Sequence, residues 1–336
     1  MSQTIMQPTP AWQVMLDGKD LTAKLAPRLL SLSLAEDRAE KADTLELTLH
    51  DDDGAMVLPP EGARLTVAFG WAKGAGVTLG LVNKGSFVVD EVRFSGPPDT
   101  VTISARSADF AGAYRKRKNR SHHGQTLGAI VALVARDNGL KASCHADLAA
   151  VVVTAAEQAH KSDMEFLRDL GRRYDAIATV KAGTLIFAPV NARTTASGKA
   201  IPSFTLTRRK ADHVDYHRAA RDGAQDGAEA QYYDQDSAAR KTVSTPGTHR
   251  KRLKKVYASQ ADARAAANSE RNRLARAAAT MSFTLALGDA RIGANTSVTV
   301  TGCKSEINKR AWRVTSVRHE LDGQRGFTTA LEMEGV

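Results

Sequence analysis

The chain has 336 residues, of which 42% are hydrophobic and only 5% aromatic, and its formal net charge is +10. This length predicts two or three domains with cores of Leu, Val, Ile and Ala. Cys144 and Cys303 lie too far apart for a disulfide framework or a zinc motif. Residues 1–10 lack the apolar core of a signal peptide, and no apolar run is long enough for a membrane helix, so we expect folding in a reducing cytoplasm and no membrane partner.

Residues 1–113 show the alternation of polar and apolar side chains that is typical of half-buried antiparallel strands. The alternating segments are residues 31–34, 44–49, 65–69 and 100–104. Turn signals such as Asp17-Gly18 and Asp53-Gly54 separate them, and the glycines within 70–80 indicate a hairpin. Short strands with this spacing predict a sandwich or a small barrel.

Residues 114–198 predict a small α/β module behind the basic run 115–120. One amphipathic helix is expected at 126–138. A second begins at Ser162, where Ser162 and Glu165 form a capping-box pattern. A hairpin over 176–187 and a polar connector at 191–199 complete the module.

Residues 199–336 return to strand patterns, at 204–207, 214–217, 281–287, 296–301, 312–319 and 327–333. Between them, about 219–258 is polar and is expected to be a long mobile excursion. An Ala-rich helix is predicted at about 259–279. The fold class is therefore α+β and mainly β.

The two strand-rich regions resemble each other in order. Residues 45–49 match 283–287, residues 87–93 match 312–318, and residues 101–104 match 328–331. Gly62-Ala63, followed by Val67 and Phe69, matches Gly293-Ala294, followed by Val298 and Val300. We infer two similar tube-like antiparallel β-barrels with the module between them. Three copies of such a chain would present six similar barrels in a ring, and a closed ring hides strand edges. The alternative is a monomer in which the duplication has no role in symmetry.

Two further blocks are similar to a known family. Residues 158–189 contain S-D-M-E-F-L-R-D-L-G-R-R-Y-D-A and T-V-K-A-G-T-L-I-F-A-P. The part from residue 275 contains M-S-F-T-L-A-L-G-D-A-R-I-G-A, V-T-V-T-G, W-R-V-T-S-V-R-H and G-F-T-T-A-L-E-M-E. Both resemble the phage late control protein D family of tail hub proteins, and the resemblance extends from about Trp12 onward. The N-terminal part of type VI secretion spike proteins is also similar. The family usually has Pro where Ala290 stands, which affects only a turn.

The resemblance implies a homotrimeric baseplate hub of a contractile phage tail that joins the hexameric tail tube to the trimeric spike. The implied partners are the tail tube protein or a tube-terminating ring, the spike protein, other baseplate proteins and the tape-measure protein. Because the chain stops at Val336, the spike is expected to be a separate polypeptide. The implied location is the tail baseplate of the virion, after assembly in the host bacterial cytoplasm.

No catalytic, cofactor or metal site is predicted. His122-His123 are adjacent and would point apart, and we place them in a helix-entry loop. Residues 50–54 lack the calcium-loop spacing, so they are expected to form a solvated turn. Asp163, Glu165 and Asp169 are interpreted as helix-cap and helix-surface residues.

The basic runs 115–120, 208–210 and 250–255 leave three interpretations open: solvated loops, contacts with tube, spike or a neighbouring subunit, or contacts with DNA. Interface residues are expected near 70–82 and 302–310 and in two of these runs. The candidates are Trp71, Val77, Leu79, Val82, Lys304, Ile307, Arg115, Arg117, Arg252 and Lys254.

A structural, non-enzymatic hub is the leading hypothesis. A nucleic-acid-binding protein is the second, because the isoelectric point is 9.6. A cell-wall hydrolase of the tail tip is the third, although no catalytic motif supports it. The hub could also belong to a tail-like bacteriocin or a secretion machine.

Overall fold

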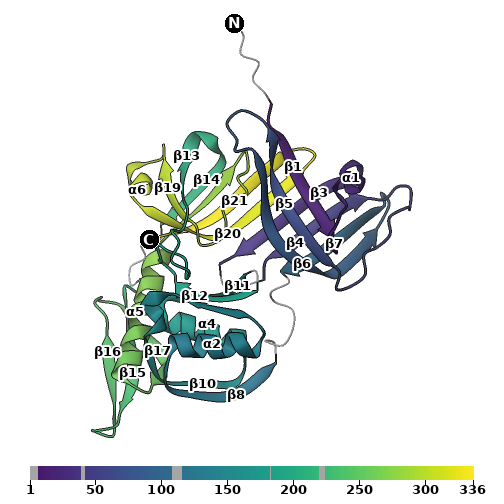
Figure 1. The fold of residues 1–336 in the computed structure, drawn as a ribbon. Helices are drawn as coiled ribbons and strands as arrows, with labels where there is room; N and C mark the ends of the chain where they lie inside the picture. Colours follow the sequence, from purple (N-terminus) through teal and green to yellow (C-terminus); the bar gives the residue numbers. More distant parts are fainter. Residues whose placement is uncertain (1–6, 39–41, 108–115, 182, 219–223) are drawn as a thin grey trace.

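The computed structural model describes residues 7–38, 42–107, 116–181, 183–218 and 224–336. Two sheet-rich lobes lie side by side, and a module containing helices lies below them (Figure 1). Strands dominate and most pair antiparallel, so the chain is mainly β with a smaller α/β part, as predicted. In the described part of the chain, no helix has the length and apolar character to cross a membrane.

The first lobe has its strands in the spatial order β3-β4-β7-β6-β5-β1-β2. Their bounds are β1 (Thr9–Leu16), β2 (Lys19–Asp20), β3 (Leu29–Asp37), β4 (Thr44–His50), β5 (Arg64–Lys73), β6 (Gly80–Ser95) and β7 (Thr100–Ser107), with α1 (Thr22–Leu25) and a 3-10 turn, η1 (Ala26–Arg28). The predicted alternation is confirmed: Leu45, Leu47 and Leu49 are buried, whereas Thr44 and Glu46 are exposed. This period of two places one apolar face in the core.

The second lobe has the order β14-β18-β21-β20-β19-β13. Its elements are β13 (Ser203–Thr207), β14 (Ala211–Arg218), β18 (Ala279–Leu285), β19 (Ser297–Thr301), α6 (Ser305–Asn308), β20 (Ala311–Asp322) and β21 (Gly326–Gly335). Only a 3-10 turn, η4 (Arg208–Lys210), separates β13 from β14. One bent segment therefore pairs with β19 through its first half and with β18 through its second half.

The two lobes share a topology over five strands, but β1 pairs antiparallel with β5, whereas β13 pairs parallel with β19, so the second lobe is not wholly antiparallel as predicted. The order β3-β4-β7-β6-β5 in the first lobe corresponds to β14-β18-β21-β20-β19 in the second. Both lobes also have β-bulges at matching places. The β3–β4 and β14–β18 pairings each shift near the start of the first strand, and the β6–β7 and β20–β21 pairings shift after Val89 and Val314. Bulges are specific features of a sheet, so their recurrence fixes which residues are equivalent.

The bulges correct part of the alignment inferred from sequence. Phe87 and Trp312 are equivalent, as predicted, but Leu45 is equivalent to Met281 instead of Phe283. A two-residue shift in the opposite direction makes Leu65 instead of Val67 the equivalent of Val298, and a one-residue shift makes Val101 the equivalent of Thr329 instead of Thr328. A shift of two residues keeps every side chain on its face of the sheet, so alternation alone cannot detect it.

The lobes are joined by β3 and β20, which pair antiparallel from Ser31 opposite Asp322 to Asp37 opposite Ser316. The described strands of the two lobes thus form one continuous 13-stranded sheet. In the first lobe, no described pairing joins β1 to β3, so the predicted barrel is not closed there by hydrogen bonds. Leu321 and Phe327, from the second lobe, pack into the core of the first lobe.

The module consists of β8 (Arg117–Thr126), α2 (Leu127–Asp137), β9 (Lys141–Cys144), α3 (Ala146–Ala149), β10 (Val152–Ser162), α4 (Asp163–Tyr174), β11 (Ala176–Lys181) and β12 (Thr184–Pro189). The predicted cap is confirmed, because Ser162 Oγ accepts a hydrogen bond from the Glu165 amide at 3.2 Å. Strand β8 was missed because its sequence, RKNRSHHGQT, has no apolar alternation.

The expectation of a mobile excursion at 219–258 is wrong for the residues that the structure describes. Strands β15 (Gly227–Asp234), β16 (Ala239–Ser244) and β17 (Arg250–Tyr257) form a sheet packed against α5 (Gln260–Ala277). The core between them is built largely from alanines, including Ala228, Ala230 and Ala263. Such small side chains give a weak hydrophobic signal in the sequence. The predicted boundary at 113–114 lies outside the described residues, and the three-domain division stays a prediction.

Candidate functional site

The contact between the two lobes has an aromatic centre. The rings of Phe69 and Phe327 stack with centroids 5.8 Å apart, and the Trp71 and Phe327 rings lie 5.5 Å apart. Trp71 Nε1 donates a hydrogen bond of 2.8 Å to the Gly288 carbonyl. The indole therefore fills the junction with its apolar body and satisfies its one donor there.

A charged cluster lies beside the aromatic centre. Lys84 Nζ is 2.8 Å from Glu36 Oε2 and also donates to the Ala290 carbonyl at 3.1 Å. Burial alone would raise the pKa of Glu36, but the nearby His319, whose Nε2 lies 3.7 Å from Glu36 Oε2, and the Lys84 charge lower that pKa to about 2. Glu36 is therefore charged at neutral pH and holds Lys84 of its own lobe against a carbonyl of the other.

His319 is fully buried at the same junction. Burial lowers the pKa of its imidazole, although Glu36 opposes the shift. Its Nε2 lies 3.1 Å from the Ile292 carbonyl, and its Nδ1 lies 3.0 Å from Thr329 Oγ1. A carbonyl only accepts, so the neutral ring carries its proton on Nε2 and accepts from Thr329 at Nδ1. This His is a structural part of the junction.

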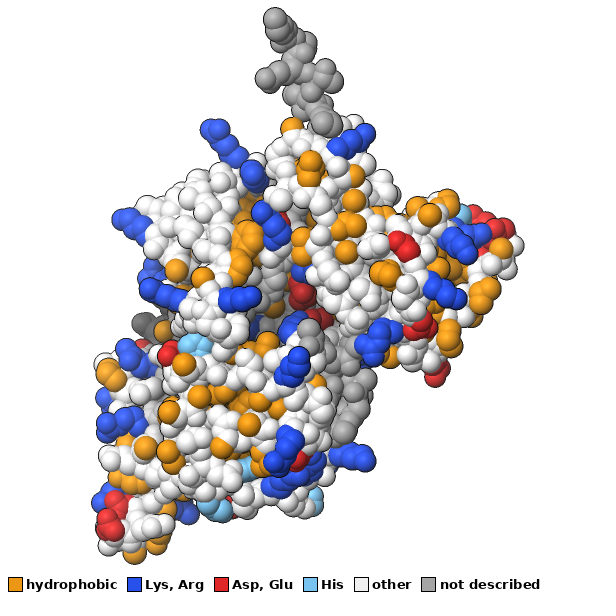
Figure 2. All heavy atoms as spheres, in the orientation of Figure 1, with side chains coloured by type: hydrophobic (Ala, Val, Ile, Leu, Met, Phe, Trp, Pro, Cys, Tyr) orange, Lys and Arg blue, Asp and Glu red, His pale blue; other side chains and the backbone are white. Residues whose placement is uncertain are grey.

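A groove of about 680 Å³ runs along the junction. The β5–β6 hairpin forms one wall and residues 203–207 and 285–292 of the second lobe form the other. Hydrophobic side chains line the seam between the upper lobes in Figure 2. Four interface candidates line this groove: Trp71, Val77, Leu79 and Val82. They lie at a contact between lobes of one chain, and their role between chains stays a prediction.

The remaining interface candidates lie elsewhere. Lys304 is exposed just before α6, whereas Ile307 is buried in the core of the second lobe and its carbonyl accepts from Trp312 Nε1 at 3.2 Å. Arg115 lies outside the described residues. Arg117 is exposed on β8 of the module. Two further candidates are exposed on the β15–β17 sheet: Arg252, which lies 3.8 Å from Glu229, and Lys254. The candidates therefore do not form a single surface.

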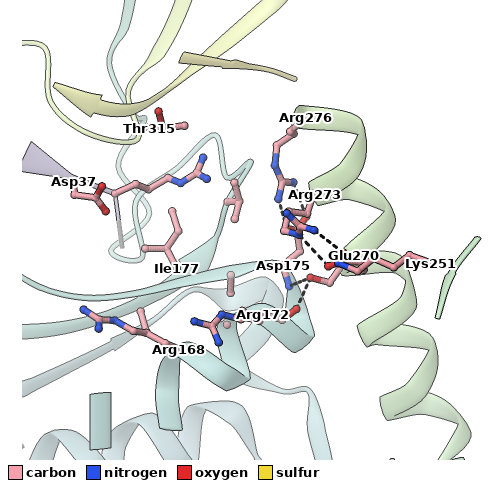
Figure 3. Close-up of a pocket in the computed structure, with 16 residues that line it drawn as sticks. Asp37, Arg168, Arg172, Asp175, Ile177, Lys251, Glu270, Arg273, Arg276 and Thr315 are labelled. Carbon is pink, nitrogen blue, oxygen red and sulfur yellow. Dashed lines mark hydrogen bonds and ion pairs between the residues drawn. The ribbon is translucent and has the colours of Figure 1, made fainter. Parts of the chain in front are cut away.

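A second junction, which the sequence analysis missed, joins α5 to the module and to both lobes (Figure 3). The buried Arg276 guanidinium binds both carboxylate oxygens of Asp175, at 2.6 and 2.9 Å, and its Nε lies 3.0 Å from Glu334 Oε1. Arg38 of the first lobe reaches the same Glu334 carboxylate. The two guanidinium groups thus connect the module, α5, β21 and the first lobe.

The histidine pair has no catalytic geometry. His122 and His123 lie on strand β8 instead of the expected helix-entry loop, and they face opposite sides of the strand. His122 is buried against the Phe166 ring, with centroids 5.1 Å apart, and its Nδ1 is 2.9 Å from Gln125 Oε1. His123 is exposed.

The carboxylate groups singled out in the sequence have structural partners. Arg28 binds Asp51 and Asp53 in the turn at 50–54. Asp163, buried at the start of α4, accepts hydrogen bonds from Lys118, Asn138 and Gln158. Within the described ranges, no cluster of three or more His, Cys, Asp or Glu side chains is arranged to hold a metal ion.

The repeated lobes and the junctions that fix them are features of a structural protein. Residues 41–324 match the family described as phage tail baseplate hub (GPD), and the chain belongs to this family. The probable baseplate hub proteins of Escherichia phages P2 and 186 are 38% and 36% identical to it. Each comparison covers 97% of this chain, with 93% of the P2 protein and 92% of the 186 protein.

The fold agrees with this assignment. The crystal structure of the 43 kDa tail protein of prophage MuSo2 from Shewanella oneidensis is similar with a TM-score of 0.69, at 16% sequence identity. The similarity covers 97% of this chain and 98% of that chain. The resemblance seen in the sequence is therefore confirmed, and the chain is a phage tail baseplate hub protein rather than an enzyme.

Proposed function

We propose that three copies of the chain form a ring with pseudo-six-fold symmetry, which joins a hexameric tail tube to a trimeric spike. The observation that carries the proposal is the shared topology of the two lobes, including their matching bulges. Three chains with two similar lobes each would present six similar units to the tube and three identical units to the spike. Closed symmetric rings also satisfy strand edges that would otherwise be exposed.

On this proposal the partners are the tube protein or a tube-terminating ring, the spike protein, other baseplate proteins and the tape-measure protein. The ring would be assembled in the host cytoplasm and carried in the tail baseplate of the virion. The lobes would form the ring, and the module with α5 and β15–β17 would form its periphery. The same architecture would serve a tail-like bacteriocin or a secretion machine.

The structure does not favour nucleic-acid binding. Several side chains of the basic runs bind carboxylates within the chain: Lys118 binds Asp163, Arg120 binds Asp137, and Lys251 binds Glu270. Stacking platforms for bases require aromatic residues beside the basic ones. Tyr257, which follows one run, is instead packed near the Arg173 guanidinium.

Native mass spectrometry of the purified chain, alone and with its tube and spike proteins, tests the ring. We expect a species of three times the 36.0 kDa chain mass that binds both partners. A stable monomer that binds neither protein would contradict the proposal. Electron microscopy of the assembly would then show whether six similar lobes surround one axis.

A further inference from the structure

One end of the first lobe carries hydrophobic side chains without a cover in the described chain. The end is formed by the β4–β5 loop and the β6–β7 turn. Val57 is 88% exposed, Leu58 50% and Phe94 56%. The end also shows acidic and basic side chains, at the right of Figure 2. Exposed apolar residues grouped with charges are typical of an interaction surface.

The equivalent end of the second lobe is covered. It comprises the β18–β19 loop and the β20–β21 turn, where Ala290, Leu321 and Phe327 are buried in the core of the first lobe. The shared bulge after Val89 and Val314 makes Phe94 the equivalent of His319. The same position is thus fully buried in one lobe and more than half exposed in the other.

The two lobes also differ in whether the edges of equivalent strands are paired. The second half of β20 pairs with β21 on one side and with β3 on the other. The equivalent half of β6, Glu91–Ser95, pairs with β7 on one side, and the described strands provide no partner on the other. Strand β14, the equivalent of β3, likewise pairs only with β18 in the described part. β14 and β6 lie on opposite sides of the β3–β20 pairing (Figure 1).

We propose that β14 of one copy of the chain pairs antiparallel with the free edge of β6 in the next copy and so repeats the β3–β20 pairing between chains. The inference rests on the proposed ring and specifies the register of its subunit contact. Leu34 lies opposite His319 within the chain, and the equivalent pair between chains is Tyr216 opposite Phe94. One residue further along β14, His217 of one copy would lie opposite Arg93 of the next copy.

The chemistry of the two edges fits this register. Tyr216 already packs edge-on against Trp312, with centroids 6.0 Å apart, and its ring would extend that cluster over Phe94. Aromatic pairs across neighbouring strands stabilise a sheet. On the opposite face, the exposed Asp215 would lie diagonally to Arg93, within reach of an ion pair.

The surrounding loops also complement each other. Within the chain, Trp71 at the end of β5 contacts the β18–β19 loop at Gly288. Between chains, the corresponding elements are the loop 302–310 after β19 and the β4–β5 loop. The first carries the exposed Lys304, and the second carries the exposed Asp52, next to Asp53, which Arg28 already binds. Opposite charges would therefore meet where Trp71 meets Gly288 within the chain.

Engineered cysteine pairs test the register. The parent is the full chain with Cys144→Ser and Cys303→Ser. One variant adds Arg93→Cys and His217→Cys, which are both exposed and preserve the aromatic pair. A second adds Phe94→Cys and Tyr216→Cys. Cβ atoms of directly opposite residues lie about 4.5–5.5 Å apart, so a short thiol-specific crosslinker is used together with mild oxidation.

We expect both pairs to give crosslinked dimers and trimers on a non-reducing gel. The register control, Phe94→Cys with His217→Cys, places the thiols on opposite faces of the sheet and should stay at monomer mass. Native mass is measured on the uncrosslinked parent. A trimeric parent whose matched pairs do not crosslink between chains, or crosslink no better than the control, overturns the register but leaves the ring. A monomeric parent overturns both.

Phe94→Asp gives a second measurement. We expect it to shift the concentration for half-assembly upward by at least tenfold, because a charge would enter a cross-strand aromatic pair. The matched control is Val152→Asp on the module, since Val152 and Phe94 are both 56% exposed. Assembly of Phe94→Asp at the same concentration as the parent and the Val152 control would contradict the proposed contact.

Discussion

At the scale of single residues, the junction between the lobes depends on a few side chains that each satisfy two demands. Trp71 fills space among aromatic rings and donates its only polar hydrogen to Gly288. Glu36 is charged although it is mostly removed from solvent, and it is paired with Lys84. Buried polar groups of this kind are costly when they lose a partner, so they hold the lobes in one arrangement.

Trp71 provides the first prediction at this scale. Trp71→Phe removes the hydrogen bond and leaves the buried Gly288 carbonyl without its donor, so we expect a loss of about 1–3 kcal/mol in the free energy of unfolding. Trp71→Ala should cost about 3–5 kcal/mol. Urea unfolding measures both. Trp12→Phe, at a half-buried position on β1, is the control and should change the stability less.

The charged cluster predicts a loss of stability in acid. The pKa of His319 is lowered in the folded protein, so the unfolded chain binds a proton first as pH falls below about 6.5. The pKa of Glu36 is also lowered, to about 2, so its contribution is lost as pH falls below its ordinary value of 4.5. Both groups therefore make the folded state less stable at lower pH.

His319→Gln separates the two contributions. We expect this variant to be less stable at pH 7, but to show a shallower fall in unfolding free energy between pH 7 and pH 5. The decline below pH 4.5, which comes from carboxylates such as Glu36, should persist. Urea unfolding at several pH values measures the slope. An unchanged slope between pH 7 and pH 5 would show that His319 does not titrate differently on unfolding.

At the scale of elements, the buried Arg276 guanidinium joins α5 to Asp175 of the module and to Glu334 of β21. Arg276→Met leaves Asp175 and Glu334 without their shared partner, and we expect a loss of about 3–5 kcal/mol in unfolding free energy. The control is Arg273→Met one turn earlier, where an exposed Arg binds Glu270 on the same helix. That pair should contribute less than about 1 kcal/mol. Similar losses in the two variants would contradict a special role of Arg276.

Elements whose signal is local were predictable from the sequence. The cap at Ser162, the leucine alternation in β4 and the Ala-rich helix all appear where they were expected. Strands β15–β17 were not predicted, because their buried residues are mostly alanines beside long basic side chains. Strand β8 is polar and gave no periodic signal either.

The junction residues show where such prediction stops. Trp71 was singled out as an interface residue, but its partner Gly288 is 217 residues away, and no local pattern connects the two. The loop position of Ile307 predicts an interface residue, but its side chain belongs to the core of the second lobe. Arg276 was missed because an Arg in a helix usually lies at the surface, and only the tertiary structure places two carboxylates around it.

At the scale of the whole molecule, the lobes are both repeated and joined into one continuous sheet. The two lobes repeat a topology, yet they are not independent, because β3 and β20 make one sheet of them and the β20–β21 turn completes the core of the first lobe. In a ring of copies, a rigid pair of lobes would repeat the same arrangement of neighbouring lobes around the axis.

The shared core predicts that damage in the second lobe spreads to the first. Phe327 lies on β21 but packs against Phe69 and Trp71 of the first lobe. We expect Phe327→Ala to lower the unfolding free energy by about 3–5 kcal/mol and to reduce amide-exchange protection in β3 and β5 as much as in β21. Leu331→Ala is the matched control, because Leu331 is on the same strand but in the core of the second lobe. It should affect β18 and β20 more than β5. Protection of β5 that survives Phe327→Ala would mean that the first lobe holds its core without the second, and the lobes could then move separately within a ring.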